Sequence, residues 1–297
     1  MSEPLSPEIL EAIPLLAGRP PAFWRCEPMG GITNRTYRVS GGDEVYVLRI
    51  AAESTHYLDR MAEAHNARIA GRLGIAPEVL HAGERLMVTG YLSGARPLGG
   101  EDFADPASLD RIGGVLHRLQ RSAEPFHGAR HPFGEIDKYL ALHPHPRTAA
   151  LRRAAEPLAA GIAKAPLAPA PAHVDPNPAN FLFCADGALR LVDWEFSAMT
   201  DPCWDIAAIL SQHPFDVDRL RRITRQVLGG ADDAVLARVA LFRAAMFLVA
   251  GSWCAMEAAF RSDADLARMA DDYLDRFADA LADPRMPRWL SGHFPTA

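Results

Sequence analysis

Lysine is nearly absent from this chain of 297 residues, which contains only Lys138 and Lys164. A mechanism that needs a lysine before residue 138 is therefore excluded. No glycine–lysine pair occurs, which excludes a P-loop nucleotide-binding motif. Positive charge is not in excess either, because the formal net charge is -6. Nucleic acid is therefore not an expected partner.

Cysteines and long apolar runs are also scarce. The four cysteines form no CxxC pair, so we expect neither a zinc ribbon nor a thioredoxin-like redox motif. Scattered cysteines fit a reducing compartment, and we expect a cytoplasmic protein. No stretch of about 18 apolar residues occurs, and the N-terminus lacks the basic segment of a signal peptide. We therefore expect no membrane partner.

The first third of the chain alternates strand and helix signals. Two strands are predicted at residues 36–40 and 45–50, joined by the turn Gly41-Gly42-Asp43. Residues 57–73 have the apolar spacing of a helix, which Gly74 ends. Two more short strands are predicted between residues 77 and 92. Residues 1–92 are therefore expected to form a small α+β lobe.

The rest of the chain is mostly helical in pattern. Apolar residues from Leu109 to Leu119 recur on one face of a predicted helix. Residues 147–163 and most of 216–282 also have helical patterns, whereas the tail after Pro284 is predicted to be irregular. We predict an α+β fold with two lobes. An antiparallel sheet and one main helix form lobe 1–92, and residues 93–297 form a mostly helical lobe.

The segment HVDPNPAN, residues 173–180, carries acidic and amide side chains between prolines, which exclude a helix interior. It leads into two apolar runs separated by Asp186-Gly187, a sequence typical of a two-residue hairpin turn. That register places Asn180 opposite Asp193, with Cβ atoms about 4.5–5.5 Å apart. Amide and carboxylate oxygens are ligands that suit Mg²⁺.

The same segment has the form H-x-D-x-x-x-x-N followed by a further aspartate. This arrangement serves phosphoryl transfer in kinase-like folds, with Asp175 in the position of the base. The alternative is that Asp175, Asn177 and Asn180 are ordinary turn residues. The hairpin and Asp193 favour the catalytic interpretation.

Two features of the first lobe fit the same chemistry. The backbone N–H groups around Gly30 and Gly31 can cover phosphates, although glycine pairs also occur in plain turns. Arg49 ends a predicted strand, and Glu63 lies in the following helix. They match the strand cation and helix glutamate that fix the α- and β-phosphates of ATP. The alternative is that Arg49 is a surface arginine.

Taken together, these segments resemble the choline/ethanolamine kinase branch of the aminoglycoside phosphotransferase superfamily, which has a protein-kinase-like fold. The similar segments lie between residues 29 and 210: GGITNRTYRV, YVLRI, YLDRMAEAHNARIAGRLGIAPEVL, HVDPNPANFLF and LVDWEFSAMTDPCWDIA. Protein kinases themselves differ, because they have lysine where Asn177 stands and DFG in place of DWE.

The resemblance implies a role for most polar residues of these segments. Asp175 would be the catalytic base, and Mg²⁺ would be held by Asn180, Asp193 and the auxiliary acid Glu195. The residues implied to contact ATP are Gly30, Gly31, Thr33, Asn34, Arg49, Glu63 and Tyr91. ATP and Mg²⁺ are the implied cofactors.

The resemblance also implies two residues that support the catalytic loop. Asp205 would brace the loop. His173 would hold it by hydrogen bonds rather than carry protons.

The acceptor implied by the resemblance is a small alcohol. Trp253 and Tyr273 are candidates for cation–π contact with a quaternary ammonium group, although Trp253 also suits a helical core. Glu257, one turn after Trp253, would supply negative charge. Gln212 stands where eukaryotic choline kinases have a glutamate, which is a departure from their pattern.

The sequence therefore predicts an ATP- and Mg²⁺-dependent kinase of an amine-alcohol, choline or ethanolamine first. Thiamine or an aminoglycoside is the alternative acceptor. A nucleotide-binding pseudokinase is the alternative of another class, although such proteins usually lack the base or the metal ligands. A monomer or a homodimer is expected.

Overall fold

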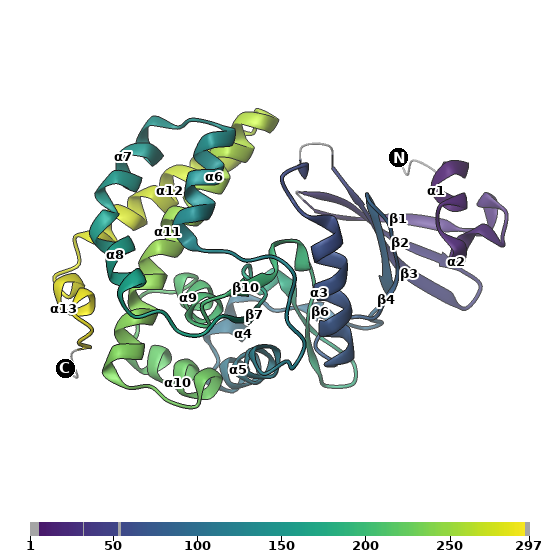
Figure 1. The fold of residues 1–297 in the computed structure, drawn as a ribbon. Helices are drawn as coiled ribbons and strands as arrows, with labels where there is room; N and C mark the ends of the chain where they lie inside the picture. The colour runs from purple at the N-terminus through teal and green to yellow at the C-terminus, as the bar shows by residue number, and fades with distance from the viewer. Residues whose placement is uncertain (1–5, 32, 53–54, 295–297) are drawn as a thin grey trace. The chain divides into compact units, whose positions relative to one another are not determined.

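The computed structural model describes residues 6–31, 33–52 and 55–294 (Figure 1). Its contacts divide the chain into two units, Met1–Leu98 with Ala179–Ser197, and Gly99–Pro178 with Ala198–Ala297. The hairpin after residue 180 thus groups with the N-terminal unit. The predicted division into a lobe of residues 1–92 and a lobe of residues 93–297 stays a prediction.

The N-terminal unit is built on an antiparallel sheet with the strand order β1-β2-β3-β5-β4. Gly41 pairs with Glu44 across the β2–β3 turn, and Gly42 is left-handed with φ +56°. The predicted glycine turn is therefore confirmed. The elements of this unit are α1 (Pro7–Glu11), α2 (Pro14–Ala17), β1 (Arg25–Gly30), β2 (Asn34–Gly41), β3 (Glu44–Ala51), α3 (Arg60–Arg72), β4 (Val79–Ala82), β5 (Leu86–Gly90), β6 (Arg96–Pro97), β8 (Phe181–Phe183) and β9 (Leu189–Leu191).

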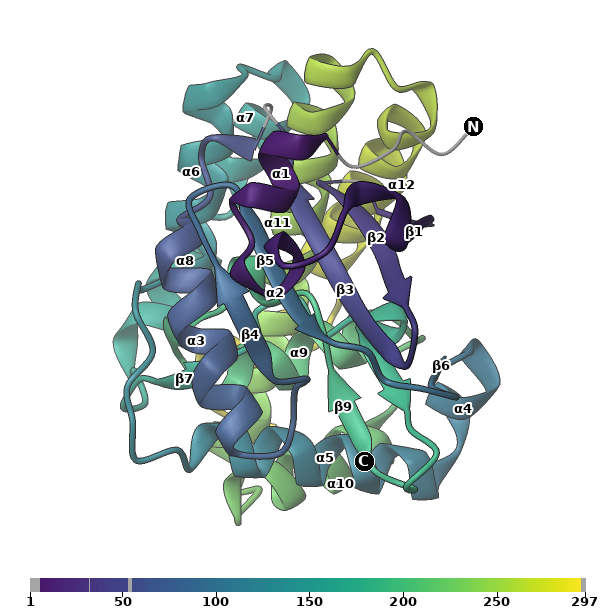
Figure 2. The same cartoon turned by 90° about the vertical axis from the view of Figure 1, so that its right-hand side faces the viewer.

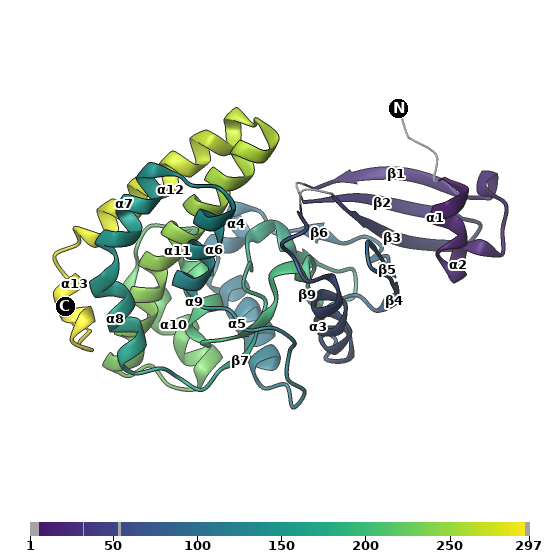
Figure 3. The ribbon, with the colours of Figure 1, turned by 45° about the horizontal axis from the view of Figure 1, so that its top comes forward.

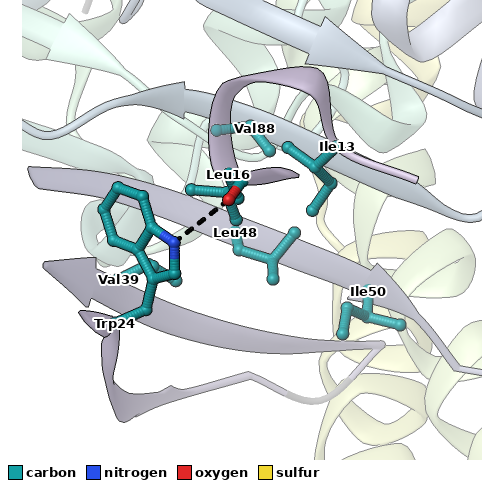
Figure 4. Packing of buried hydrophobic residues seen from close by; sticks show 7 residues of the cluster. All are labelled: Ile13, Leu16, Trp24, Val39, Leu48, Ile50 and Val88. Carbon is teal, nitrogen blue, oxygen red and sulfur yellow. Dashed lines mark hydrogen bonds between the residues drawn. The ribbon is translucent and has the colours of Figure 1, made fainter. Parts of the chain in front are cut away.

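The two faces of this sheet differ in chemistry because side chains alternate along a strand. Leu48 and Ile50 of β3 belong to the apolar cluster that α1 and α2 cover (Figures 2 and 4). The Trp24 indole N–H donates to the Leu16 carbonyl at 3.2 Å and fixes this layer. Arg49, between Leu48 and Ile50, therefore projects to the other face. The buried members of the cluster are Ile13, Leu16, Trp24, Val39, Leu48, Ile50 and Val88.

The predicted helix over residues 57–73 is confirmed as α3, which begins at Arg60. Its cap is Asp59, whose carboxylate accepts from the backbone N–H groups of Met61 and Ala62 at 3.1 and 2.9 Å. Gly74, left-handed with φ +69°, follows its last turn. Glu63 lies in the first turn of α3 and is buried.

The predicted register of the β8–β9 hairpin is wrong by one residue. The Cys184 N–H donates to the Ala188 carbonyl, and the Gly187 N–H donates to the Cys184 carbonyl, both at 2.9 Å. These bonds enclose a three-residue loop that ends in left-handed Gly187, with φ +77°. The extra loop residue shifts the pairing.

The longer loop changes which residue lies opposite Asn180. The Val192 N–H donates to the Asn180 carbonyl at 3.0 Å. Asn180 therefore does not face Asp193 as predicted, although the two residues remain at the same open end of the hairpin.

The second unit is mostly helical, as predicted. Its elements are α4 (Gly100–Ala104), α5 (Pro106–Gln120), α6 (Pro132–Leu142), α7 (Pro146–Ala154), α8 (Glu156–Lys164), β7 (Ala170–Ala172), β10 (Ala198–Thr200), α9 (Cys203–Ser211), α10 (Val217–Leu228), α11 (Asp233–Arg261), α12 (Ala264–Leu281) and α13 (Met286–Leu290). Helix α11 runs through the middle of this unit and contacts α6, α7, α8 and α12 (Figures 1 and 3).

Helix α11 is, within the described ranges, the one helix long and apolar enough to cross a membrane. However, 72% of its most apolar window is buried inside the structure. This burial identifies α11 as the core helix around which the second unit packs.

The predicted helix at 147–163 is two helices, because Pro157 in the first turn of α8 lacks the N–H that a continuous helix needs. The tail was predicted to be irregular after Pro284, and this is wrong, since α13 forms there. Its Trp289 is buried and stacks on Phe215, with ring centroids 5.4 Å apart. Tertiary packing of aromatic rings therefore stabilises a helix too short for sequence patterns to indicate.

The three-residue loop predicts the effect of replacing Gly187. Gly187→Ala places a Cβ atom on left-handed backbone and is expected to lower the free energy of unfolding by about 1 kcal/mol. Urea denaturation measures this difference. Gly83→Ala is the matched control, because Gly83 also lies in a hairpin turn but is not left-handed. Equal stability of the two variants would contradict the observed loop.

Candidate active site

Arg49 is the centre of a buried cluster of charges in the N-terminal unit. Its guanidinium donates to Glu63 at 2.6 Å and to Asp193 at 2.5 Å, and Glu195 lies 3.6 Å away. Burial alone lowers the pKa of Arg49, but these carboxylates raise it by more than burial lowers it. The side chain therefore stays charged. The structure therefore brings Arg49 and Glu63 together, as the sequence indicates.

A second guanidinium completes the cluster. Arg60 donates to Glu63 at 2.7 Å and to Glu195 at 3.0 Å. Sequence reasoning missed Arg60, although its spacing of three residues from Glu63 at the start of α3 was a usable signal. Three carboxylates, including that of Asp193, face two guanidiniums, so the cluster carries one surplus negative charge when all three are ionised.

Glu195 is buried and fully engaged. Its carboxylate accepts from the Thr33 hydroxyl at 2.6 Å and from the Asn34 amide at 2.7 Å, besides Arg60. Burial raises the pKa of Glu195, but Arg49 and these donors lower it below its ordinary value. Glu195 is therefore held as an anion.

The predicted phosphate-covering glycines immediately precede this contact. Gly30 and Gly31 are left-handed, with φ +88° and +127°. A Cβ atom at Gly31 would lie 2.6 Å from the carbonyl oxygen of Asn34, so only glycine fits this bend. Tyr91 is the other predicted nucleotide contact. The Arg38 guanidinium lies over its ring, with the guanidinium carbon 5.2 Å from the ring centroid.

Asp193 follows β9 in a left-handed conformation, with φ +68° and ψ +63°. Its side chain is 35% exposed. The loss of water contacts raises the pKa of Asp193 although Arg49 opposes this shift, and the carboxylates of Glu195 and Glu63 raise it further.

The donors at this end of the hairpin fit a magnesium ion. Among the residues that the structure describes, no group of three or more His, Cys, Asp or Glu side chains lies close enough to hold a metal. Mg²⁺ nevertheless needs only one or two protein oxygens, because phosphates and water supply the rest. Asp193 and Asn180 provide such oxygens, and the surplus negative charge favours a cation.

The predicted catalytic loop lies in the second unit and is braced by Asp205. This fully buried carboxylate accepts from the backbone N–H groups of His173 and Val174, both at 2.8 Å. The Trp204 indole donates to the Val174 carbonyl at 2.9 Å. The support predicted for Asp205 is thus present as contacts, and Trp204 adds to it.

Val174 is strained, with φ +75°. A left-handed conformation is rare for a β-branched residue and costs roughly 1–2 kcal/mol. The three hydrogen bonds to Asp205 and Trp204 hold it there. Strain of this kind occurs where the surrounding structure fixes a functional loop.

Asp175 follows the strained residue. Its carboxylate accepts from the Asn177 amide at 3.0 Å, and its carbonyl accepts from the Asn177 backbone N–H at 2.9 Å. The second bond closes a three-residue turn centred on Pro176. One carboxylate oxygen is therefore oriented by its own loop.

Two of the four predicted acceptor residues pack against one apolar cluster. Trp253 of α11 and Tyr273 of α12 pack against the same apolar cluster as Cys254. Burial, and next the Asp175 carboxylate, raises the pKa of Cys254 to about 12. Burial raises the pKa of Tyr273 too, with Asp175 adding to the shift. The Asp175 carboxylate thus acts electrostatically on Cys254 of α11 and on Tyr273 of α12.

The other two predicted acceptor residues are placed differently. Glu257 is fully buried and pairs with Arg261 at 2.6 Å, so its charge is compensated. Gln212 is exposed at the end of α9, two turns beyond Asp205. Their part in substrate binding stays a prediction.

The brace predicts how stability depends on pH. Burial raises the pKa of Asp205 to about 6, although its two backbone donors lower it. In the unfolded chain an aspartate has a pKa of about 4. Between these two pKa values Asp205 is protonated in the folded state and ionised in the unfolded chain. Its contribution to the free energy of unfolding therefore falls as the pH rises. The advantage of the wild type over Asp205→Asn should fall by on the order of 2 kcal/mol from pH 4.5 to 7.

Urea denaturation of both proteins across this range measures the difference. An advantage that grows with pH would contradict the raised pKa of Asp205.

Comparison with known proteins agrees with this geometry. Residues 26–242 match the model of APH, a phosphotransferase enzyme family. Protein LicA of Haemophilus influenzae is 29% identical over 198 residues, which are 62% of this chain and 57% of LicA. The chain therefore spans little more than half of this curated relative.

Solved structures are also similar. A choline/ethanolamine kinase family protein from Mesorhizobium loti is 31% identical, with a TM-score of 0.79 over 96% of this chain and 97% of that chain. Choline kinase LicA from Streptococcus pneumoniae is 23% identical, with a TM-score of 0.76 over 87% of this chain and 93% of its own. A LicA complex with AMP matches with 23% identity and a TM-score of 0.75, over 86% and 91% of the two chains.

The predicted α+β protein-kinase-like fold is thereby confirmed. The family model covers most of the chain, and the relative from Mesorhizobium loti matches nearly end to end. The chain belongs to the phosphotransferase enzyme family, in its choline/ethanolamine kinase branch.

Proposed function

We propose that this protein is a cytoplasmic kinase that transfers the γ-phosphate of ATP to the hydroxyl group of a small cationic alcohol, choline or ethanolamine first. Family membership supports phosphoryl transfer. The names of the relatives support this choice of acceptor. The partner is then the amine-alcohol itself.

The observation that carries the proposal is the setting of Asp175. Its carboxylate is oriented by Asn177, follows a strained residue, and acts electrostatically on α11 and α12 beside two aromatic side chains. A carboxylate so placed can accept the proton of an acceptor hydroxyl. An aromatic ring such as that of Trp253 suits an ammonium group, and the Tyr273 ring already lies under the Arg276 guanidinium.

The N-terminal unit would bind the nucleotide. Glu63 fixes the Arg49 guanidinium, which can donate to phosphate oxygens, as a lysine does in protein kinases. Asn180 and Asp193 would hold Mg²⁺, which when bound neutralises phosphate charge. The LicA complex with AMP supports an adenine nucleotide as the ligand.

The base role of Asp175 predicts a selective loss. Asp175→Asn keeps the size of the side chain but cannot accept a proton, so kcat should fall by about 100-fold or more. Binding of Mg-ATP, measured by calorimetry, should be unchanged. Asn177→Ala is a milder control that removes the orienting amide and leaves the base. Full turnover by Asp175→Asn would remove the proposed mechanism.

The aromatic setting predicts a selective effect on the acceptor. Trp253→Leu should raise the KM for choline about 10-fold, because a cation–π contact is worth about 1–2 kcal/mol, and should leave the KM for ATP unchanged. Met269→Leu, an exposed change on α12, is the control.

A coupled ADP-release assay over choline, ethanolamine, thiamine and aminoglycosides identifies the acceptor. Turnover with thiamine or an aminoglycoside alone would replace the proposed acceptor. Nucleotide binding without turnover on any of them would favour a pseudokinase.

A further inference from the structure

The buried carboxylate of Glu195 is hydrogen-bonded to two residues of the segment that follows the glycine pair. The Thr33 hydroxyl donates to one of its oxygens at 2.6 Å, and the Asn34 amide donates to the other at 2.7 Å. The Asn34 amide also lies 3.2 Å from the Thr33 hydroxyl. Thr33, Asn34 and Glu195 are all less than a tenth exposed.

Arg60 completes this group of residues, which we name the Glu195 clamp: Thr33, Asn34, Arg60 and Glu195. Arg60 donates to the oxygen that Asn34 contacts, at 3.0 Å. Each carboxylate oxygen thus has at least one short, largely water-excluded donor. Hydrogen bonds to a charged acceptor are the stronger kind.

The side of the clamp that carries Glu195 is rigid. The Asn66 amide of α3 donates to the Ser197 carbonyl at 3.0 Å, and the Ser197 hydroxyl donates to the Trp194 carbonyl at 2.5 Å. The Trp194 indole donates to the Leu191 carbonyl at 3.2 Å. Glu195 is therefore a fixed point, two residues beyond Asp193.

The other side of the clamp follows two adjacent glycines. Gly30 and Gly31 are both left-handed, and the β1–β2 pairing is irregular between Pro28 and Gly30. Glycine has the widest choice of backbone conformations. Among the described residues, Gly30 is paired with Thr36 of β2, and we infer that the clamp at Thr33 and Asn34 fixes the remaining freedom of the pair.

We infer that Glu195 is a positioning residue, which through Thr33 and Asn34 holds the backbone of Gly30 and Gly31 in the conformation that receives the nucleotide phosphates. The inference rests on the proposed function for the identity of the ligand. It assigns Glu195 a task that does not require metal binding, because its oxygens already accept three hydrogen bonds.

A double-mutant cycle tests the clamp through nucleotide binding. Thr33→Val removes only the hydroxyl donor, and Glu195→Gln removes the charge that the donors share. Each change should raise the Kd for Mg-ADP, measured by calorimetry, about 5- to 10-fold. The double variant should bind no more than about 2-fold weaker than the weaker single variant, because both changes break one interaction.

Control variants separate this role from others. Thr33→Ser keeps the hydroxyl and should retain wild-type affinity. Thr89→Val makes the same chemical change at a buried position of β5 and should have no effect. If the Kd for Mg-ADP of the double variant rises by the product of the two single increases, Thr33 and Glu195 act independently. That result would overturn the clamp. A loss in Glu195→Gln that excess Mg²⁺ abolishes, with Thr33→Val normal, would overturn it in favour of a metal ligand.

Hydrogen exchange tests the clamp without a nucleotide. Amide exchange around Gly30 and Gly31 should be faster in Thr33→Val and Glu195→Gln than in the wild type or Thr89→Val. Unchanged exchange would overturn the clamp even if the protein is a kinase. Failure of the wild type to bind Mg-ADP, with faster exchange in the two variants, would overturn the proposed function and the nucleotide role of the clamp.

Discussion

The compensation of buried carboxylates by two arginines is the constraint on which the N-terminal unit depends. Glu63 and Glu195 are withdrawn from water, which is costly unless each charge is paired and hydrogen-bonded. Arg49 and Arg60 supply that pairing from β3 and α3. The same contacts link the sheet, the helix and the segment after β9, so the charges proposed to serve phosphate chemistry also hold this unit together.

The second unit solves a different problem, which is to hold one loop in an unfavourable shape. Val174 is left-handed, and a side chain from α9 and an indole beside it compensate for the strain. A single neutral hydrogen bond contributes about 1 kcal/mol, which barely offsets the strain of Val174. Two backbone donors converging on one carboxylate, with Trp204 in addition, are enough to fix the residue before Asp175.

The sequence predicted those parts of the site that rest on local patterns. Arg49 and Glu63 were paired correctly, because a strand and a helix with clear periodicity carry them. The hairpin register was missed by one residue, since Asp186-Gly187 is compatible with both a two- and a three-residue loop. The pairing of Arg60 with Glu63 had a local signal in their spacing of three residues, which was overlooked. Trp204 and the engagement of Glu195 depend on contacts between segments distant in sequence, which no local pattern contains.

The relation between the proposed acceptor residues was the least predictable feature for the same reason. Trp253 and Tyr273 lie on different helices, and only their packing against one apolar cluster relates them. Glu257 illustrates the reverse case. One turn from Trp253 it is an obvious source of charge, yet Arg261 one turn further on compensates it.

The central claim is that this chain phosphorylates the hydroxyl group of an amine-alcohol. Phosphorus NMR of the purified protein with ATP, Mg²⁺ and either choline or ethanolamine tests it most directly. The account predicts a new phosphomonoester resonance that grows in step with ADP. ADP appearing only with inorganic phosphate, or an unchanged spectrum with both acceptors, would contradict it.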